Sequence, residues 1–256
     1  MSDFDRNYAA ARGGVGERAV AVDAGLRAYM VRVYNYMAAA VALTGVVSWL
    51  TYQAAGGSAI TATAGGLSGV TPFGAMILSG PVMIGLVLAT LGLVFFLSFR
   101  IQRLEFTTAW GLFMLYAALL GVMLTPIFLA YTGASITRVF FISAASFGAL
   151  SLWGYTTQRD LSGFGSFLIM GLFGIIIASI VNIFLKSSGM DFIISVIGVL
   201  VFAGLTAYDT QRIKEMYDVN DDGTVSGRKA VMGALSLYLD FINLFLMLLR
   251  LVGDRR

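Results

Sequence analysis

Two aspartates in long apolar segments are the residues of this sequence best suited to chemistry. Asp209 follows residues 204–208 and Asp240 follows residues 235–239, and neither of these segments contains another charge. Charged groups in a lipid environment are costly, so those that remain usually face a cavity or a partner. Two carboxyl groups that approach one another in a low-dielectric interior cannot both stay ionised, and they share a proton. The two aspartates are therefore a candidate proton-sensing pair, unless each simply hydrogen-bonds a neighbouring group.

Other polar residues accompany both aspartates at helical spacing. Around Asp240, polar side chains recur at intervals of four, three and seven residues, which places them on one face of a helix. The connection between the two aspartate-bearing segments, residues 213–229, is short enough for them to pack as antiparallel neighbours. A polar stripe on an otherwise apolar helix should line a bundle interior or a pore. The pore-lining candidates are Thr206, Ser236, Asn243 and Arg250.

Two arginines follow an earlier apolar segment and are expected on the same side of the membrane as Asp209. Either Arg100 or Arg103 could pair with Asp209 and close one end of a cavity, which makes both of them latch candidates. Alternatively, they are ordinary basic anchors at the membrane surface.

The composition predicts an integral membrane protein. Of the 256 residues, 58% are hydrophobic and 12% are charged, and the mean hydropathy is +0.84. Soluble domains carry about a quarter charged residues, and a membrane-spanning helix needs ~20 apolar residues. We therefore predict an all-α membrane protein, with a cytoplasmic tail at residues 1–29 and a seven-helix transmembrane domain at residues 30–256. The seven apolar runs are residues 30–52, 81–99, 106–130, 137–156, 163–185, 191–212 and 230–252.

The distribution of lysine and arginine predicts the orientation in the membrane. The links around residues 100–103, 159 and 212–229 carry basic residues, whereas the link at residues 53–80 carries no charge. This asymmetry places the N-terminus in the cytoplasm. The arginines at residues 250–256 conflict with seven crossings from a cytoplasmic start. The last run therefore either spans against the rule or re-enters and returns.

Missing residue types exclude several functions. The sequence has no cysteine and no histidine, which excludes disulfides, thiolate nucleophiles, the usual zinc and haem sites, and Ser-His-Asp catalysis. No Walker loop or Rossmann fingerprint is present, so we predict no cofactor. The net charge of +3 is not gathered into a dense basic stripe, so we expect no nucleic-acid partner.

Residues 218–229 match the start of an EF-hand loop without its end. Ligand-type side chains stand at the first, third and fifth positions and Gly223 at the sixth, but the twelfth position holds Lys229 where a bidentate glutamate is needed. We interpret the segment as a solvated turn and predict no firm metal site. Calcium would be coordinated only transiently, by the oxygens near Asp209 and Asp240.

Three segments together carry a more specific pattern. They are residues 205–214 (LTAYDTQRIK), residues 234–246 (ALSLYLDFINLFL) and residues 91–99 (LGLVFFLSF), the last followed by Arg100 and Arg103. The pattern resembles the bacterial branch of the Bax inhibitor-1 family, also called the TMBIM or YccA-like family. Helix number and short loops agree with that family over roughly residues 25–253.

The resemblance implies a seven-helix bundle with the last helix central, in a bacterial inner membrane. It implies a pH-sensitive Ca²⁺ leak in which Asp209 and Asp240 sense protons and an arginine of the second helix latches onto Asp209. One position departs from the family: Thr90 stands where some relatives carry an acidic residue that could pair with the arginine of the last helix. We therefore expect Arg250 to lack that partner.

Two other functions compete with a channel. A regulatory membrane protein of the stress response would bind a membrane protease, with the charged tail at residues 1–29 as a contact. An intramembrane aspartyl protease would use the two aspartates to activate water. The flanking residues differ from those of such proteases, because Asp240 follows Leu237-Tyr-Leu and the last helix has no proline. We expect that the protein is not an enzyme and that its partners are lipid, Ca²⁺ and protons.

Overall fold

The computed structural model describes residues 3–63 and 66–256, and the side chains of residues 23–61 and 66–256. In that part of the chain seven helices are long and apolar enough to cross a membrane, as the composition predicts. The long helices are α1 (Asp3–Ala55), α3 (Gly80–Arg100), α4 (Phe106–Met123), α6 (Gly133–Thr156), α7 (Ser162–Leu185), α8 (Ser188–Glu215) and α9 (Gly223–Val252). The short elements are η1 (Gly57–Ala59), β1 (Thr61–Thr63), β2 (Gly66–Ser68), α2 (Pro72–Ile77), η2 (Ile101–Arg103) and α5 (Ile127–Ala130).

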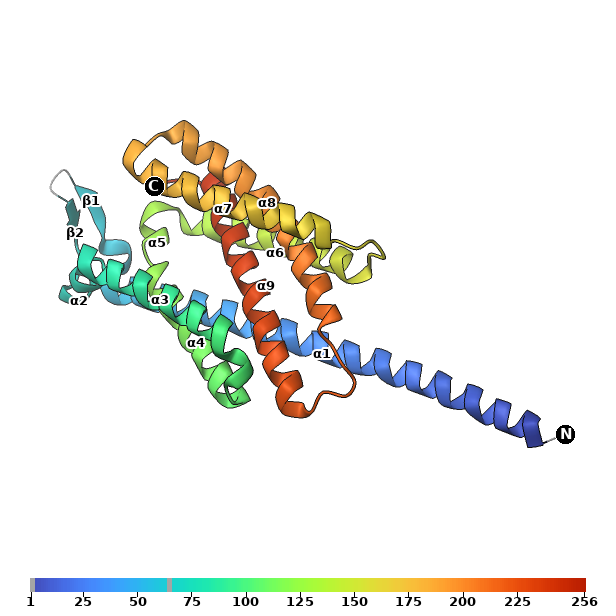
Figure 1. The fold of residues 1–256 in the computed structure, drawn as a ribbon. Helices are drawn as coiled ribbons and strands as arrows, with labels where there is room; N and C mark the ends of the chain where they lie inside the picture. The colour runs from blue at the N-terminus through green and yellow to red at the C-terminus, as the bar shows by residue number, and fades with distance from the viewer. Residues whose placement is uncertain (1–2, 64–65) are drawn as a thin grey trace.

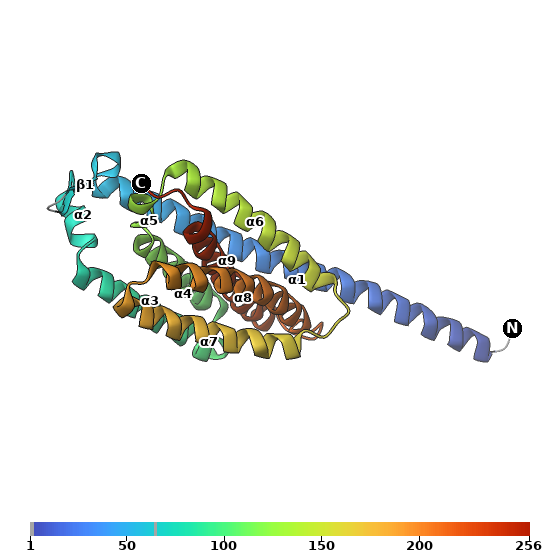
Figure 2. The same cartoon turned by 90° about the horizontal axis from the view of Figure 1, so that it is seen from above.

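The last helix, α9, is the centre of the bundle, as predicted. It packs against α8, α1, α6 and α4, and the two views of Figures 1 and 2 place it among them. In its most apolar window 67% of the residues are buried, against 11% for α3 at the periphery. The helices around it have apolar residues on all sides, which suits a bundle whose outer surface faces lipid.

The two ends of the bundle differ. We call the end from which α1 extends the N-side and the end at which the chain finishes the C-side (Figure 1). The connections of α3 to α4, α6 to α7 and α8 to α9 lie on the N-side, and the others lie on the C-side. Because α9 is one continuous helix, it crosses the bundle and does not re-enter, so the two termini lie at opposite ends.

Proline marks two of the helix boundaries. Pro126 has no N–H to donate and precedes the short helix α5, so the third apolar run is split after Met123. Pro81 occupies the first turn of α3, where a missing N–H leaves no intrahelical bond unmade.

The uncharged link between the first two spans contains regular elements that its low-complexity sequence does not predict. Strands β1 and β2 pair antiparallel, with Thr61 opposite Ser68. The segment is attached to α1 through Thr71, whose N–H donates to the carbonyl of Ala55 (2.9 Å) and whose hydroxyl donates to that of Ala54 (2.8 Å). At Gly69 the backbone has φ +76° and a Cβ would overlap the carbonyl of Ala59, so glycine is required for this close approach.

The N-terminal tail is continuous with the first span. Helix α1 runs without a break from Asp3 to Ala55, and its candidate membrane span begins at Asp23. Residues 1–2 and the side chains of residues 3–22 lie outside the described part. That residues 1–29 form a cytoplasmic tail stays a prediction.

Candidate intramembrane site

The two aspartates singled out in the sequence meet at the interface of α8 and α9. These helices are antiparallel neighbours joined by residues 216–222, and they form the most extensive helix pair in the bundle. The carboxyl groups of Asp209 and Asp240 lie within hydrogen-bonding reach of one another. The structure therefore brings together the two aspartates that the sequence places on neighbouring helices. That they sense protons stays a prediction.

Asp240 is enclosed more completely than is usual for a carboxyl group. Its side chain is 5% exposed, and among the described residues its Oδ2 has no N–H or hydroxyl donor. A buried carboxyl oxygen without a partner is strongly unfavourable. That Asp240 and Asp209 share a proton stays a prediction, based on the cost of two adjacent buried charges.

The cation that acts on Asp209 comes from its own helix. The guanidinium of Arg212, one turn further along α8, attracts the Asp209 carboxylate. Arg100 and Arg103 lie at the N-side ends of α3 and η2 with exposed side chains, and in the described part of the chain neither forms an ion pair. Their role as latch stays a prediction. The sequence alone does not identify Arg212 as a partner of Asp209, because a basic residue at the end of an apolar helix usually indicates a membrane anchor.

The predicted pore-lining residues divide into two groups. Thr206 is buried and donates its hydroxyl to the carbonyl of Phe202 (2.8 Å), and the Asn243 amide donates to the carbonyl of Leu239 (2.8 Å). Together with Ser236, which is half-buried, they line none of the five main cavities in the described residues. Arg250 is exposed on the C-side and lines a separate cavity there.

A chain of hydroxyl groups connects the site to two further helices. The Tyr34 hydroxyl on α1 is 2.6 Å from Oγ of Ser151 on α6, which is 2.8 Å from Oγ1 of Thr210 on α8. Thr210 also donates to the carbonyl of Thr206 (2.7 Å). Since Thr210 adjoins Asp209, this chain fixes the part of α8 that carries the site.

A second hydroxyl pair holds α9 from the opposite side. Oγ1 of Thr44 on α1 is 2.7 Å from the hydroxyl of Tyr238, and both side chains are buried. Oγ1 also lies 2.9 Å from the carbonyl of Ala117 on α4, so one threonine joins three helices. Single neutral hydroxyls give no signal in the sequence, which is why these contacts were missed.

Two acidic side chains of the EF-hand-like segment bind other residues of the same segment. Oδ1 of Asp218 accepts hydrogen bonds from the backbone N–H and the side-chain amide of Asn220 (both 2.9 Å), which lower the pKa of Asp218 below its usual value. Lys229, at the position where calcium loops need glutamate, pairs with Asp221 at 2.6 Å. The predicted turn is present at residues 216–222, whereas residues 223–229 belong to α9. That the segment holds no firm metal site stays a prediction.

Comparison with known proteins decides the family. Over residues 26–256 the chain matches the family described as "Inhibitor of apoptosis-promoting Bax1". The chain belongs to the Bax inhibitor-1 family. Among its relatives in this family, the inner membrane protein YbhL of Escherichia coli (strain K12) is 47% identical over 91% of this chain and 94% of the relative. The protein RP147 of Rickettsia prowazekii (strain Madrid E) is 48% identical over 91% and 92%, and a protein of Caulobacter vibrioides is 42% identical over the whole of both chains.

Proposed function

We propose that this Bax inhibitor-1 protein is a pH-sensitive Ca²⁺ leak channel gated by Asp209 and Asp240, in a bacterial inner membrane. The observation that carries the proposal is the close approach of the two carboxyl groups between adjacent helices. Intramembrane carboxyl groups typically mark ion or proton pathways. The chain has no histidine, so these carboxyl groups are the groups available to respond to pH inside the bundle.

A proton shared by the pair would provide a gating mechanism. While the pair holds one proton, a hydrogen bond joins α8 to α9 and the site is closed. A change in the number of protons changes this attraction, because two ionised carboxylates repel and two neutral groups carry no charge. Hard cations prefer oxygen ligands, and Thr206, Ser236 and Asn243 add neutral oxygens on the same two helices. Two carboxylates with such neighbours are better suited to transient coordination of a passing Ca²⁺ than to a permanent Ca²⁺ site.

A latch between α3 and the pair would require movement of α3. This helix packs mainly on α4 and is the least buried span, so it has few contacts to lose. Arg100 or Arg103 would then replace Arg212 as the cation attracting Asp209.

Calcium flux into dye-loaded liposomes, scanned from about pH 5 to 8, tests the gate. Wild-type protein is expected to conduct in a pH-dependent manner. Asparagine has nearly the shape of a protonated aspartate, so Asp209→Asn and Asp240→Asn should each lose the pH dependence. At every pH of the scan, we expect the flux of both variants to stay near the value that the wild-type protein shows at the acidic end.

Asp160→Asn is the matched control, because Asp160 is exposed in the link between α6 and α7 and caps the N–H of Ser162 (2.8 Å). It removes the same charge at a distance from the pair, and its pH profile should equal that of wild type. Flux no greater than that of empty liposomes at every pH would contradict the channel. In that case the regulatory reading, in which the N-terminal segment of α1 contacts a membrane protease, becomes the better one.

A further inference from the structure

A polar cavity of about 660 Å³ lies on the C-side, outside the aspartate site. Its walls come from the end of α7, the start of α8, the end of α9 and the C-terminal residues. The cations that line it are Lys186, Arg250 and Arg255. The proposed gate makes no use of this cavity.

Positive charge in the cavity is not neutralised by the protein. In the described part of the chain the ion pairs are Arg138–Asp254 and Lys229–Asp221, so none of the three lining cations has an anionic partner. The lining includes one carboxylate, Asp191, which accepts a hydrogen bond from the amide of Asn182 at 2.7 Å. Three cations against one anion leave an excess of positive charge.

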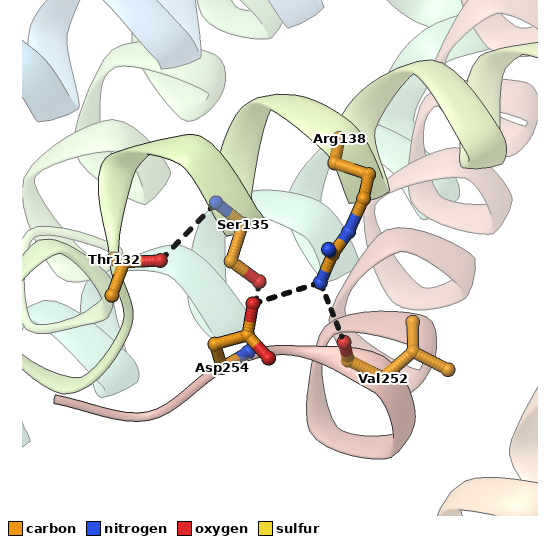
Figure 3. Close-up of polar contacts among 5 residues, drawn as sticks. All are labelled: Thr132, Ser135, Arg138, Val252 and Asp254. Carbon is orange, nitrogen blue, oxygen red and sulfur yellow. Dashed lines mark hydrogen bonds and ion pairs between the residues drawn. The ribbon is translucent and has the colours of Figure 1, made fainter.

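The chain segment that carries Arg255 is fixed in place. As Figure 3 shows, Arg138 on α6 binds the carboxylate of Asp254 (2.9 Å) and the carbonyl of Val252 (3.3 Å). The N–H of Asp254 donates to the buried Ser135 hydroxyl (2.9 Å), and its carbonyl accepts from the N–H of Thr132 (3.1 Å). Arg255 itself forms an antiparallel bridge with Tyr131. The arginine is therefore built into the wall.

Lys186 stands at a position where the backbone favours another residue. It ends α7 with φ 49° and ψ 36°, the left-handed conformation that glycine usually supplies at this place. Among the described residues other than glycine, Lys186 alone has a positive φ. A strained backbone kept at a cavity wall points to a use for the side chain.

We propose that this cavity binds the phosphate head group of an anionic phospholipid. Arginine and lysine are the usual partners of phosphate, and arginine can bind it through two parallel hydrogen bonds. The residues that line it come from the C-side ends of α7, α8 and α9, where we expect lipid head groups to meet the bundle. Exposed Ile183 and Phe192 form part of the same wall and would contact the acyl chains. A ligand with both phosphate and hydrocarbon fits this combination better than free phosphate.

Native mass spectrometry of the full chain in detergent tests the site with dioleoylphosphatidylglycerol and dioleoylphosphatidylcholine as probes. We expect one phosphatidylglycerol to be retained where phosphatidylcholine is not. The double variant Lys186→Gly with Arg250→Gln should raise the Kd for phosphatidylglycerol by about tenfold or more, since each basic residue near a membrane surface contributes roughly fivefold. Lys186→Gly suits the left-handed backbone, so its thermal midpoint should equal or exceed that of wild type.

Arg256→Gln is the matched control, because it removes a cation at the same end from a residue that does not line the cavity. Its Kd should stay within about twofold of wild type, less than the contribution of one basic residue at the membrane surface. Equal retention of both lipids, or an unchanged Kd in the double variant, would overturn the proposal. Displacement of phosphatidylglycerol by millimolar inorganic phosphate would also overturn it, in favour of a free phosphate ligand.

Discussion

Gln211 illustrates how a single uncharged residue organises the N-side of the site. Its side chain is 8% exposed, its Oε1 accepts the N–H of Leu161 (2.9 Å), and its amide donates to the carbonyl of Arg159 (2.8 Å). One glutamine on α8 thus supplies the polar partners of the link that leads into α7. It lies two residues beyond Asp209, so the end of α8 that carries the proposed gate is held to the rest of the bundle.

Replacing Gln211 by leucine should destabilise the protein. The buried N–H of Leu161 would lose its acceptor, which costs about 1–3 kcal/mol. Denaturant titration in detergent should show this as a lower free energy of unfolding. Gln158→Leu, at an exposed position of the same link, should change the free energy by about 0.5 kcal/mol or less. Equal effects of the two substitutions would contradict the role assigned to Gln211.

At the same scale, the sequence predicts charged members of the site better than neutral ones. Asp209 and Asp240 are conspicuous because carboxyl groups are rare in apolar segments. Tyr34 and Ser151 are not, because hydroxyl residues are frequent in membrane helices and most satisfy their own helix. Only the fold brings those two side chains together across α1 and α6.

Helices α6 and α8 approach closely beside the site, and Gly154 makes this approach possible. A Cβ at Gly154 would overlap the carbonyl oxygen of Ala207, two residues before Asp209. Small residues at such crossings let backbones approach where lipid supplies no hydrophobic driving force.

Gly154→Ala should therefore push α8 away from α6 and destabilise the bundle by about 1–3 kcal/mol, the usual effect of overpacking. Gly148→Ala is its control on the same helix, because a Cβ there meets no atom within 4 Å. That substitution should be neutral or stabilising by up to about 1 kcal/mol, since alanine favours helix over glycine. The thermal unfolding midpoints of both variants test this prediction. A Gly154→Ala midpoint equal to that of wild type would refute the packing argument.

The positions of the spans were predictable, but not their ends. Hydropathy detects the apolar core of α8 and α9 and misses the helical turns that extend beyond it, such as residues 213–215 and 223–229. Lysine and arginine form helix well, so these residues do not end a helix. Helix α2 was missed because it is held by contacts with α1, and strands β1 and β2 were missed because they are held by pairing with each other. Neither kind of contact is visible in the local sequence pattern.

For the whole molecule, seven crossings place the N-side and the C-side on opposite faces of the membrane. The basic residues of the N-side connections favour a cytoplasmic N-side. The C-side arginines oppose that rule, and the proposed binding of an anionic lipid head group would give Arg250 and Arg255 another role.

Single engineered cysteines can test this orientation, because the natural chain has none. Asn220→Cys on the N-side should react with a membrane-impermeant maleimide only after cells are permeabilised. Arg256→Cys on the C-side should react in intact cells. Both positions are exposed in the structure, so lack of reaction reflects the membrane rather than burial. Labelling of both from the same side would contradict seven crossings.

The central place of α9 also has a consequence for biogenesis. The helix most enclosed by the others is the last to leave the ribosome, so α1, α4, α6 and α8 enter the membrane before their common partner exists. Until it arrives, the Asp209 carboxyl lacks the neighbouring carboxyl of Asp240. A nascent chain interrupted before residue 223 therefore presents an unpaired carboxyl group within the bilayer, a feature by which quality-control machinery can distinguish an unfinished molecule from a complete one.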